Sequence, residues 1–350
     1  MKTNKAGWPW INAEPTVYET HINWPKISIV TPSFNQGQFI EETILSILNQ
    51  GYPNLEYIII DGGSTDQTLD IIKKYDGNIN FWVSEKDRGQ SHAINKGIDK
   101  CTGEIFNWIN SDDVMLEGSL KAIAHTFIEN PMLEVSAFKA EKFGQVITNM
   151  IVPRAQETMS LEQYLFQFWL MQPSTFFKLS IFKSLGGLKE VFHYCMDTEF
   201  FIRYFLLNGT EKMMLNEQVI LKFRMHEMSK SIGSQLKFNE ERLGIDLAIC
   251  RAVLQQPSEK TYLNQITRTE LKSIEMASSI AINQSALKAA FDTKWKPWVE
   301  DSSLRYRSVA EYAAWYGDTK NQRIYSLKAI QMNPFKILNW KYLANALLKR

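Results

Sequence analysis

Short runs of β-branched and aromatic residues alternate with segments of helical periodicity over residues 26–130. The runs predict four buried strands, at residues 27–31, 56–60, 81–83 and 105–109. The segments that follow them predict four helices. Three lie at residues 39–49, 90–100 and 117–129, and the other can be capped by Asp66 and contains Leu69, Ile71 and Ile72. Strands that alternate with helices form a mostly parallel sheet with helices on both faces. We therefore expect an α/β fold in this part of the chain.

The alternation ends near residue 135. Beyond it we expect a helix at residues 161–171, an extended piece at 172–177, a helix at 195–207, a flexible loop at 221–235 and helices from 236 onward. The chain is thus expected to consist of an aromatic N-terminal arm at 1–25, a body at 26–235 and a C-terminal helical domain at 236–350.

Composition and charge exclude several classes of protein. The 350 residues include 39 Lys and Arg against 38 Asp and Glu, so the net charge of +1 predicts no nucleic-acid partner. The three cysteines, Cys101, Cys195 and Cys250, are far apart, which argues against a disulfide framework or a thiolate zinc site and fits the cytoplasm. The sequence shows no secretory signal and no run of about 18 apolar residues.

The C-terminal helices are rich in aromatic and basic residues, such as Trp295, Lys296, Trp298, Arg305 and Arg307. A packed helical domain is the interpretation we favour for them. The alternative is peripheral contact with a membrane, which would place the protein at its inner face.

Polar or acidic residues follow each predicted strand, at residues 31–35, 61–66, 84–89 and 110–113. Ligands bind beyond the carboxyl ends of parallel strands, so these residues mark the expected site. Carboxylates brought together repel one another, which favours a hard divalent ion with oxygen ligands. Each motif alone is common turn chemistry. No glycine-rich phosphate loop is present, which argues against a dinucleotide dehydrogenase or a nucleoside triphosphatase.

Four segments carry a resemblance to a known family. In order they are VTPSFNQGQFIEETILSILNQ, YIIIDGGSTDQTLDII, SEKDRGQSHAINKGI and GEIFNWINSDDVMLEGSL, and together they resemble the family-2 inverting glycosyltransferases of the A-type fold. The resemblance continues through residues 172–176 and 196–200 to about residue 232. It implies a Rossmann-like nucleotide-sugar-binding half at 26–130 and an acceptor-binding half at 131–235.

The resemblance also implies the donor-binding residues, which are Pro32, Ser33, Phe34, Asn35, Asp61, Gly62, Asp87, Arg88, Asn110, Ser111 and Asp112. Among them, Asp61 would accept a hydrogen bond from the base. Residues 110–113 are similar to the Asp-x-Asp metal motif, with Asn110 where an Asp often stands, so one charge is lost. The implied ligands of Mn²⁺ or Mg²⁺ are Asp112, Asp113 and His226, and which of the two aspartates binds directly stays open.

The implied catalytic base is Asp197, for which a helix N-cap is the alternative interpretation. We expect three further residues to contact the acceptor or to support the residues that do, namely Glu199, Gln172 and Arg224. Glu199 is also the alternative candidate for the catalytic base. The segment from Arg224 to His226 resembles a loop that closes over the diphosphate. For His226 itself, a surface residue without function is the alternative.

The function implied by the resemblance is transfer of a sugar, with inversion, from a nucleotide sugar to a hydroxyl of a glycan or a lipid-linked acceptor. A UDP-sugar is the expected donor, and GDP- or dTDP-sugars are alternatives. One rival is an inactive sugar-nucleotide-binding or scaffold protein that interacts through its C-terminal helices. A second rival is a nucleotidyltransferase, although residues 32–35 supply no glycine-rich basic loop for it.

Overall fold

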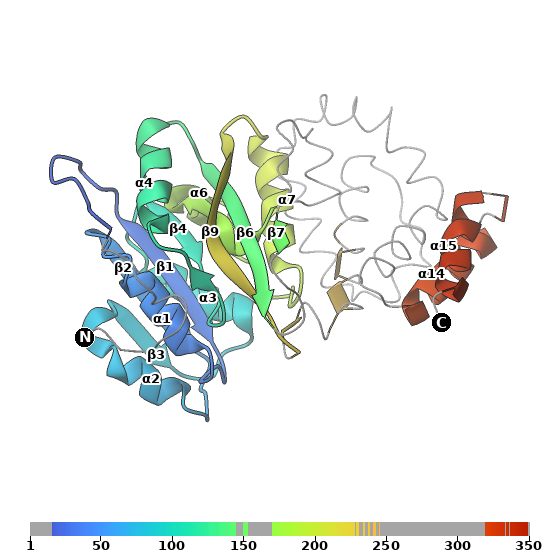
Figure 1. Cartoon of the computed structure of the whole chain (residues 1–350), viewed down its shortest axis with the longest axis horizontal. Helices are drawn as coiled ribbons and strands as arrows, with labels where there is room; N and C mark the ends of the chain where they lie inside the picture. Colours follow the sequence, from blue (N-terminus) through green and yellow to red (C-terminus); the bar gives the residue numbers. More distant parts are fainter. Residues whose placement is uncertain are drawn as a thin grey trace. The chain divides into compact units, whose positions relative to one another are not determined.

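The computed structural model divides the chain into two compact units, Met1–Ser229 and Lys230–Arg350 (Figure 1). The structure describes residues 16–144, 150–152, 170–227, 229–230, 234, 237–238, 241–242, 245, 319–332, 334–335 and 337–348. Residues 161–169 of the predicted helix at 161–171, most of the predicted C-terminal domain, and the Trp295–Arg307 cluster lie outside these residues.

The first unit is built on one nine-stranded sheet. Its strands are β1 (Ile27–Ser33), β2 (Leu55–Asp61), β3 (Phe81–Ser84), β4 (Ile105–Trp108), β5 (Val114–Met115), β6 (Val135–Gly144), β7 (Met150–Val152), β8 (Thr175–Lys178) and β9 (Met213–Met225). The spatial order is β3-β2-β1-β4-β8-β6-β9-β5, and β7 pairs with β6. The four predicted strands pair in parallel, as expected. Beyond β4, antiparallel pairs with β8 and between β8 and β6 make the complete sheet mixed.

Helices cover both faces of the sheet (Figure 1). They are α1 (Ile40–Leu48), α2 (Thr68–Lys74), α3 (Gln90–Lys100), α4 (Ser119–Glu129), α6 (Leu179–Ser184) and α7 (Met196–Asn208). Apolar side chains of α1, α2 and α4 form one buried cluster with Ile27 and Ile29 of β1. On α3, a methyl group at Gly97 would lie 2.5 Å from Val30 Cγ1, so this helix packs closely against the other face of β1.

A second core of aromatic rings joins the parallel half to the mixed half. Phe182 of α6 stacks on Phe200 of α7, with ring centroids 3.9 Å apart, and meets Phe106 of β4 at 4.8 Å. Phe177 of β8 lies 5.2 Å from Phe200. These rings are fully buried, so they fix α7, which begins at Met196, against the end of the parallel sheet.

Two local predictions are wrong. Residues 221–225 are the end of β9 and not part of a flexible loop, because Leu221 and Lys222 pair with β5 and residues 221–225 also pair with β6. Residues 172–174 form a 3-10 turn before β8 and are not extended. Pro173 stands near the start of that turn, where its missing N–H costs nothing.

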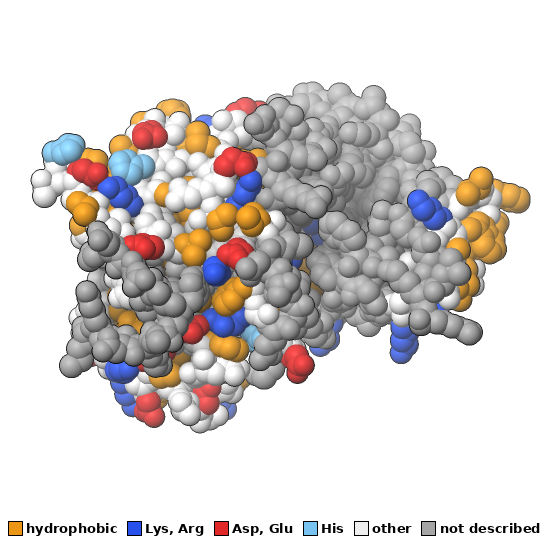
Figure 2. Space-filling model, in the orientation of Figure 1, with side chains coloured by type: hydrophobic (Ala, Val, Ile, Leu, Met, Phe, Trp, Pro, Cys, Tyr) orange, Lys and Arg blue, Asp and Glu red, His pale blue; other side chains and the backbone are white. Residues whose placement is uncertain are grey.

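The second unit contains α14 (Thr319–Met332) and α15 (Ile337–Leu348), which agrees with the expected helical C-terminal extension. Figure 2 shows hydrophobic side chains at the surface of this unit. Among its described side chains, the exposed large apolar ones are Ile324, Leu327, Met332, Phe335, Ile337, Trp340 and Leu347. Within the described residues, every helix is too short or too polar to cross a membrane.

Candidate donor and metal site

The carboxyl ends of β1, β2 and β3 meet at one edge of the sheet. Ser33 is the register partner of Asp61, and Asp61 is the partner of Ser84. The Gly62 N–H donates to the Ser33 carbonyl over 2.8 Å, which joins the loop after β2 to the end of β1. The predicted donor-binding segments are therefore adjacent in the fold.

Asp61 is fully buried, and protein donors occupy both of its carboxylate oxygens. Oδ2 accepts the N–H groups of Gly63 at 3.1 Å and Ser64 at 2.9 Å and the Ser84 hydroxyl at 2.6 Å. Oδ1 accepts the Ser64 hydroxyl at 2.5 Å. Hydrogen bonds to an ionised acceptor are strong, so Asp61 fixes the loop at residues 61–64.

The loop after β1 presents an aromatic ring at this edge. Asn35 has a φ of +52°, which asparagine tolerates better than most residues. Its N–H donates to Ser64 Oγ over 2.7 Å, and its Oδ1 accepts the Thr65 N–H at 2.9 Å. Phe34 is 59% exposed, whereas the hydroxyl of Ser33 is buried with no hydrogen-bond partner among the described residues.

Asp87 and Arg88 lie in the loop before α3 and point to different partners. Asp87 Oδ1 accepts the Gly89 N–H at 2.8 Å. The Arg88 guanidinium pairs with both carboxylate oxygens of Glu190, at 2.8 and 3.0 Å. Arg88 therefore connects the donor edge, which is the edge of the sheet where β1, β2 and β3 end, to the segment that precedes α7.

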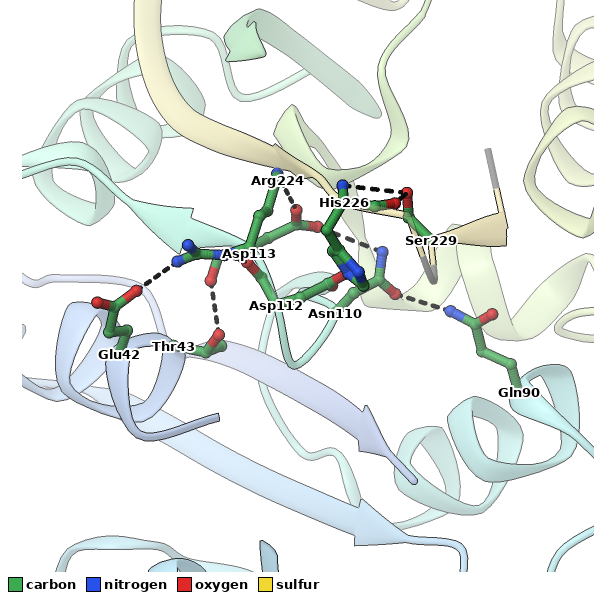
Figure 3. A network of polar contacts seen from close by, with 9 residues as sticks. All are labelled: Glu42, Thr43, Gln90, Asn110, Asp112, Asp113, Arg224, His226 and Ser229. Atoms are coloured by element: carbon green, nitrogen blue, oxygen red, sulfur yellow. Dashed lines mark hydrogen bonds and ion pairs between the residues drawn. The ribbon is translucent and has the colours of Figure 1, made fainter. Parts of the chain in front are cut away.

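The acidic loop at residues 110–113 is held by β9 (Figure 3). Asp113 is fully buried; its Oδ1 accepts the Arg224 N–H at 3.1 Å and its Oδ2 accepts Asn110 Nδ2 at 3.3 Å. Burial, reinforced by the neighbouring Asp112 carboxylate, raises the pKa of Asp113 well above its usual range. Asn110 Oδ1 in turn accepts a hydrogen bond from Gln90 Nε2 at 2.8 Å.

Asp112 and His226 form a hydrogen-bonded pair in this loop region, and the two side chains together could hold a metal ion. Asp112 Oδ2 lies 3.0 Å from His226 Nε2. Adjacent ligands of an octahedral ion at about 2.1 Å are separated by about 3.0 Å, so the spacing suits Mg²⁺ or Mn²⁺. Both oxygens of Asp113 already accept hydrogen bonds, which makes it a support for the loop. Among the described residues, no group of three or more His, Cys, Asp or Glu side chains forms a complete metal centre.

Arg224 holds this arrangement through several contacts, and its partner Glu42 is not among the site residues predicted from the sequence. Its Nε donates to the Asp112 carbonyl at 2.9 Å, and its Nη2 pairs with Glu42 of α1 (Figure 3). Its guanidinium also lies over the rings of Phe39 and Phe143, 4.9 and 4.6 Å from their centroids. The sequence offered no signal for Glu42, which resembles any acidic residue in the first turn of a helix.

Asp197 and Glu199, predicted on the catalytic and acceptor side, lie in the first turn of α7. Asp197 is its second residue and is partly exposed, whereas the N-cap residue is Cys195, so Asp197 is not the N-cap. Its Oδ1 accepts the Thr198 N–H at 2.6 Å. Ser91 of α3 contacts Met196 Sδ at 2.9 Å, and the preceding residue on α3 contacts the acidic loop. The start of α7 therefore lies near the same edge of the sheet.

Glu199 and Gln172 are bound within the protein. Both oxygens of Glu199 pair with Arg203, at 2.9 and 2.7 Å, and both side chains are buried. Gln172 Nε2 donates to Asn107 Oδ1 at 3.0 Å and to the Trp108 carbonyl at 2.8 Å. The structure thus leaves Asp197 as the partly exposed carboxylate of the first turn of α7.

Comparison with known proteins agrees with this architecture. Residues 28–181 match the model of the family described as "Glycosyl transferase family 2". An uncharacterized glycosyltransferase of Haemophilus influenzae is 32% identical over 115 residues, which are 32% of this chain and 46% of that protein. The GalNAc(5)-diNAcBac-PP-undecaprenol beta-1,3-glucosyltransferase of Campylobacter jejuni is 32% identical over 103 residues, 28% of this chain and 33% of that protein.

These two matches span less than half the length of either relative. In structure, residues 1–349 of S. aureus TarS in complex with UDP-GlcNAc align with a TM-score of 0.54 and 16% identity. The alignment covers 92% of this chain and 90% of that chain, which shows that the two share a fold.

Proposed function

Residues 28–181 of this chain are a family-2 glycosyltransferase domain, and on that premise we propose that the protein transfers a sugar from a UDP-sugar to a hydroxyl group. The observation that carries the proposal is the 3.0 Å approach of Asp112 to His226 beside the loops that end β1, β2 and β3. The UDP donor is supported by the UDP-GlcNAc complex of TarS. A lipid-linked glycan as the acceptor is supported by the name of the C. jejuni relative.

The reaction we propose is a single displacement. The acceptor oxygen bonds to the anomeric carbon as the bond to the nucleoside diphosphate breaks, and the anomeric centre inverts. Asp197 takes the proton of the acceptor hydroxyl on its carboxylate. Arg224 and Asp113 keep the loop of Asp112 in place. A divalent ion, Mg²⁺ or Mn²⁺, held by Asp112 and His226 would neutralise the charge that develops on the leaving diphosphate.

The test is a panel of UDP-, GDP- and dTDP-sugars, assayed by thermal melting and by sugar transfer or hydrolysis, with Mg²⁺, Mn²⁺ or a chelator. A ligand that binds the native state raises the melting temperature, so we expect UDP-sugars with metal to do so. Asp112→Asn should lose the metal response, whereas Asp70→Asn, on the exposed side of α2, should keep it. Equal binding and turnover in chelator would contradict the metal assignment.

The same panel separates the enzyme from the inactive binding protein. Both bind the donor, but only the enzyme releases UDP from it in a reaction that needs Asp197. Donor binding without any turnover, across a set of hydroxyl acceptors and water, would favour the binding protein.

A further inference from the structure

The C-terminal helix pair carries the excess positive charge of the protein. Residues 319–350 contain seven Lys and Arg residues and no Asp or Glu. Because the whole chain has a net charge of +1, the other 318 residues together carry −6. A block of one sign produces a local field that attracts an anionic partner, although the net charge of the chain is close to zero.

The exposed face of α14 is partly apolar. Ile324 and Leu327 are exposed, and the exposed Lys320 lies on the same face, because helix positions four and seven residues apart are aligned. The polar residues Gln322 and Ser326 are buried instead. A helix at the surface of a globular unit in water normally shows the opposite arrangement. The exposed face of α14 is therefore suited to contact with an apolar partner.

The connection and α15 expose the same two kinds of side chain. Phe335 in the connection is 93% exposed, and Ile337 at the start of α15 is 83% exposed. Ile337, Trp340 and Leu347 share one face of α15, and Lys341 lies beside Ile337 one turn further along. Figure 2 shows hydrophobic side chains together with Lys and Arg side chains in this unit. We call the exposed apolar residues of 319–348, with Lys320 and Lys341, the apolar–basic surface.

Three kinds of partner fit the apolar–basic surface poorly. A second copy of the helix pair would bring seven cations against seven others with no carboxylate between them, and these would repel one another. A nucleic acid would match the cations through its phosphates but leave the aliphatic side chains unburied. An acidic protein would have to accept five lysines, a residue type that is depleted from protein interfaces.

An anionic bilayer matches both components of the surface. Apolar side chains of an amphipathic helix enter the boundary between headgroups and acyl chains, while Lys and Arg extend to the lipid phosphates. Trp is also favoured at this boundary. The Trp340 indole N–H donates to the Pro334 carbonyl over 2.7 Å, so the ring is fixed although half of it is exposed.

We propose that α14, α15 and their connection dock the protein on a membrane surface that contains anionic lipids. The apolar side chains enter the lipid boundary, and Lys320 and Lys341 contact the headgroups. The lipid-linked acceptor of the proposed function would lie in such a surface, but the inference does not depend on that function.

The test is sedimentation of the full-length protein with vesicles, in the absence of nucleotide. One set of vesicles is phosphatidylcholine alone, and the other contains equal parts of phosphatidylcholine and phosphatidylglycerol. We expect binding to the mixed vesicles at low salt and binding at least about tenfold weaker to phosphatidylcholine alone. Most of the binding to the mixed vesicles should be lost at high salt, because salt screens the cations.

Two double variants examine the two components of the surface. Lys320→Gln with Lys341→Gln should weaken binding to the mixed vesicles about tenfold or more, because each cation close to an anionic surface adds to the attraction. Phe335→Ser with Ile337→Ser should also weaken it about tenfold or more, because it removes two of the most exposed apolar side chains.

The matched controls lie in the first unit. Lys73→Gln with Lys100→Gln removes two exposed cations there, and Val17→Ser with Met132→Ser removes two apolar side chains that are 76% and 75% exposed. Both controls should bind the mixed vesicles as wild type does. Melting curves verify that every variant is folded.

The outcomes separate the membrane from other partners. Absence of binding to the mixed vesicles, or equal binding by wild type and both test variants, would overturn the inference. Binding to polyglutamate but not to vesicles would assign the surface to an acidic polypeptide. A dimer that Phe335→Ser with Ile337→Ser dissociates, without vesicle binding, would assign it to a second copy. Each of these results leaves the proposed function in place, because the nucleotide-sugar panel tests that function by itself.

Discussion

The carboxylates at and near the donor edge fall into two kinds, according to whether their side chains are buried or partly exposed. Asp61 and Asp113 are fully buried and accept hydrogen bonds from their own surroundings, so they shape loops. Asp112, Asp87 and Asp197 are partly exposed, so each can meet a ligand. The acidic motifs could be predicted from the sequence, but this division could not, because it depends on burial and on donors far along the chain.

Asp197→Asn is expected to abolish transfer while donor binding persists. The amide preserves the shape of the side chain but cannot accept the proton, and loss of a general base typically costs about 10²–10⁴ in rate. Transfer rate and UDP-sugar affinity are measured on the same preparation. A variant that loses donor affinity would show instead that Asp197 supports the structure.

Glu199→Gln is the matched comparison on the same turn of α7, and here we expect a loss of stability. The change leaves Arg203 buried without its anionic partner, and breaking a buried pair in this way costs about 3–5 kcal/mol. Denaturant unfolding measures the loss. Glu199→Gln with unchanged stability and abolished transfer would move the catalytic base to Glu199.

At the scale of elements, prediction and structure differ most at the end of β9. Its last residues were expected to be a loop because Ser and Gly follow closely. The strand instead continues to Met225, since β5 and β6 pair with it on either side. Pairing between strands that are distant in sequence leaves little local signal. Consequently the contacts that Arg224 makes with Asp112 and Glu42 could not be predicted, although Arg224 and His226 themselves were.

Glu42→Gln should raise the metal concentration needed for half-maximal donor binding several-fold. The ion pair with Glu42 restrains Arg224, which donates to the Asp112 carbonyl, and a partly exposed pair contributes about 1 kcal/mol or less. Glu41→Gln is the control, because Glu41 bonds to Lys74 and Tyr75 at the end of α2. Equal metal dependence in the two variants would show that Glu42 does not support the metal site.

Glu56 of β2 joins elements at the opposite end of the sheet. It accepts hydrogen bonds from Ser28 of β1 at 2.5 Å and from the Thr102 N–H at 2.7 Å, and it pairs with Lys26 at 2.8 Å. Burial opposes its ionisation, but the hydrogen bonds from Lys26, Ser28 and Thr102 lower the pKa of Glu56 to about 2.

Because this pKa is below the unfolded value of about 4.3, Glu56 stabilises the fold fully above that pH, and the contribution disappears as pH falls toward 2. We expect Glu56→Gln to lower the melting temperature at pH 7 and to flatten its fall between about pH 4.3 and 2. Glu129→Gln, exposed at the end of α4, is the control. If the melting temperatures of wild type and Glu56→Gln fell equally across this pH range, the assignment would be contradicted.

At the scale of the whole molecule, the parallel half could be predicted because a helix is the next long element after each of β1, β2, β3 and β4. The alternation of 2-residue and 3.6-residue periods therefore appears in consecutive segments. In the mixed half, β8 lies between β4 and β6 although it follows both in sequence. Such an order has no periodic signature, so the sequence indicated only isolated pieces there.

Every candidate site residue lies within the first unit, Met1–Ser229. We therefore expect a protein of residues 1–229 to melt cooperatively and to bind UDP with the affinity of the full chain. Calorimetry on both proteins measures this. A folded 1–229 protein with much weaker UDP binding would show that residues 230–350 contribute to the donor site.

The long separation between the acidic loop and its supports has a consequence for synthesis on the ribosome. Asp112 leaves the ribosome 112 residues before Arg224, which is roughly 6–22 s at about 5–20 residues per second. During that interval β1 to β4 can already pair, while Asp112 and Asp113 still lack the guanidinium and imidazole that later face them. The nascent chain therefore passes through a stage with an assembled donor edge and an unsupported acidic loop. The site is completed only when Arg224 and His226 have emerged, and residues 227–350 follow them.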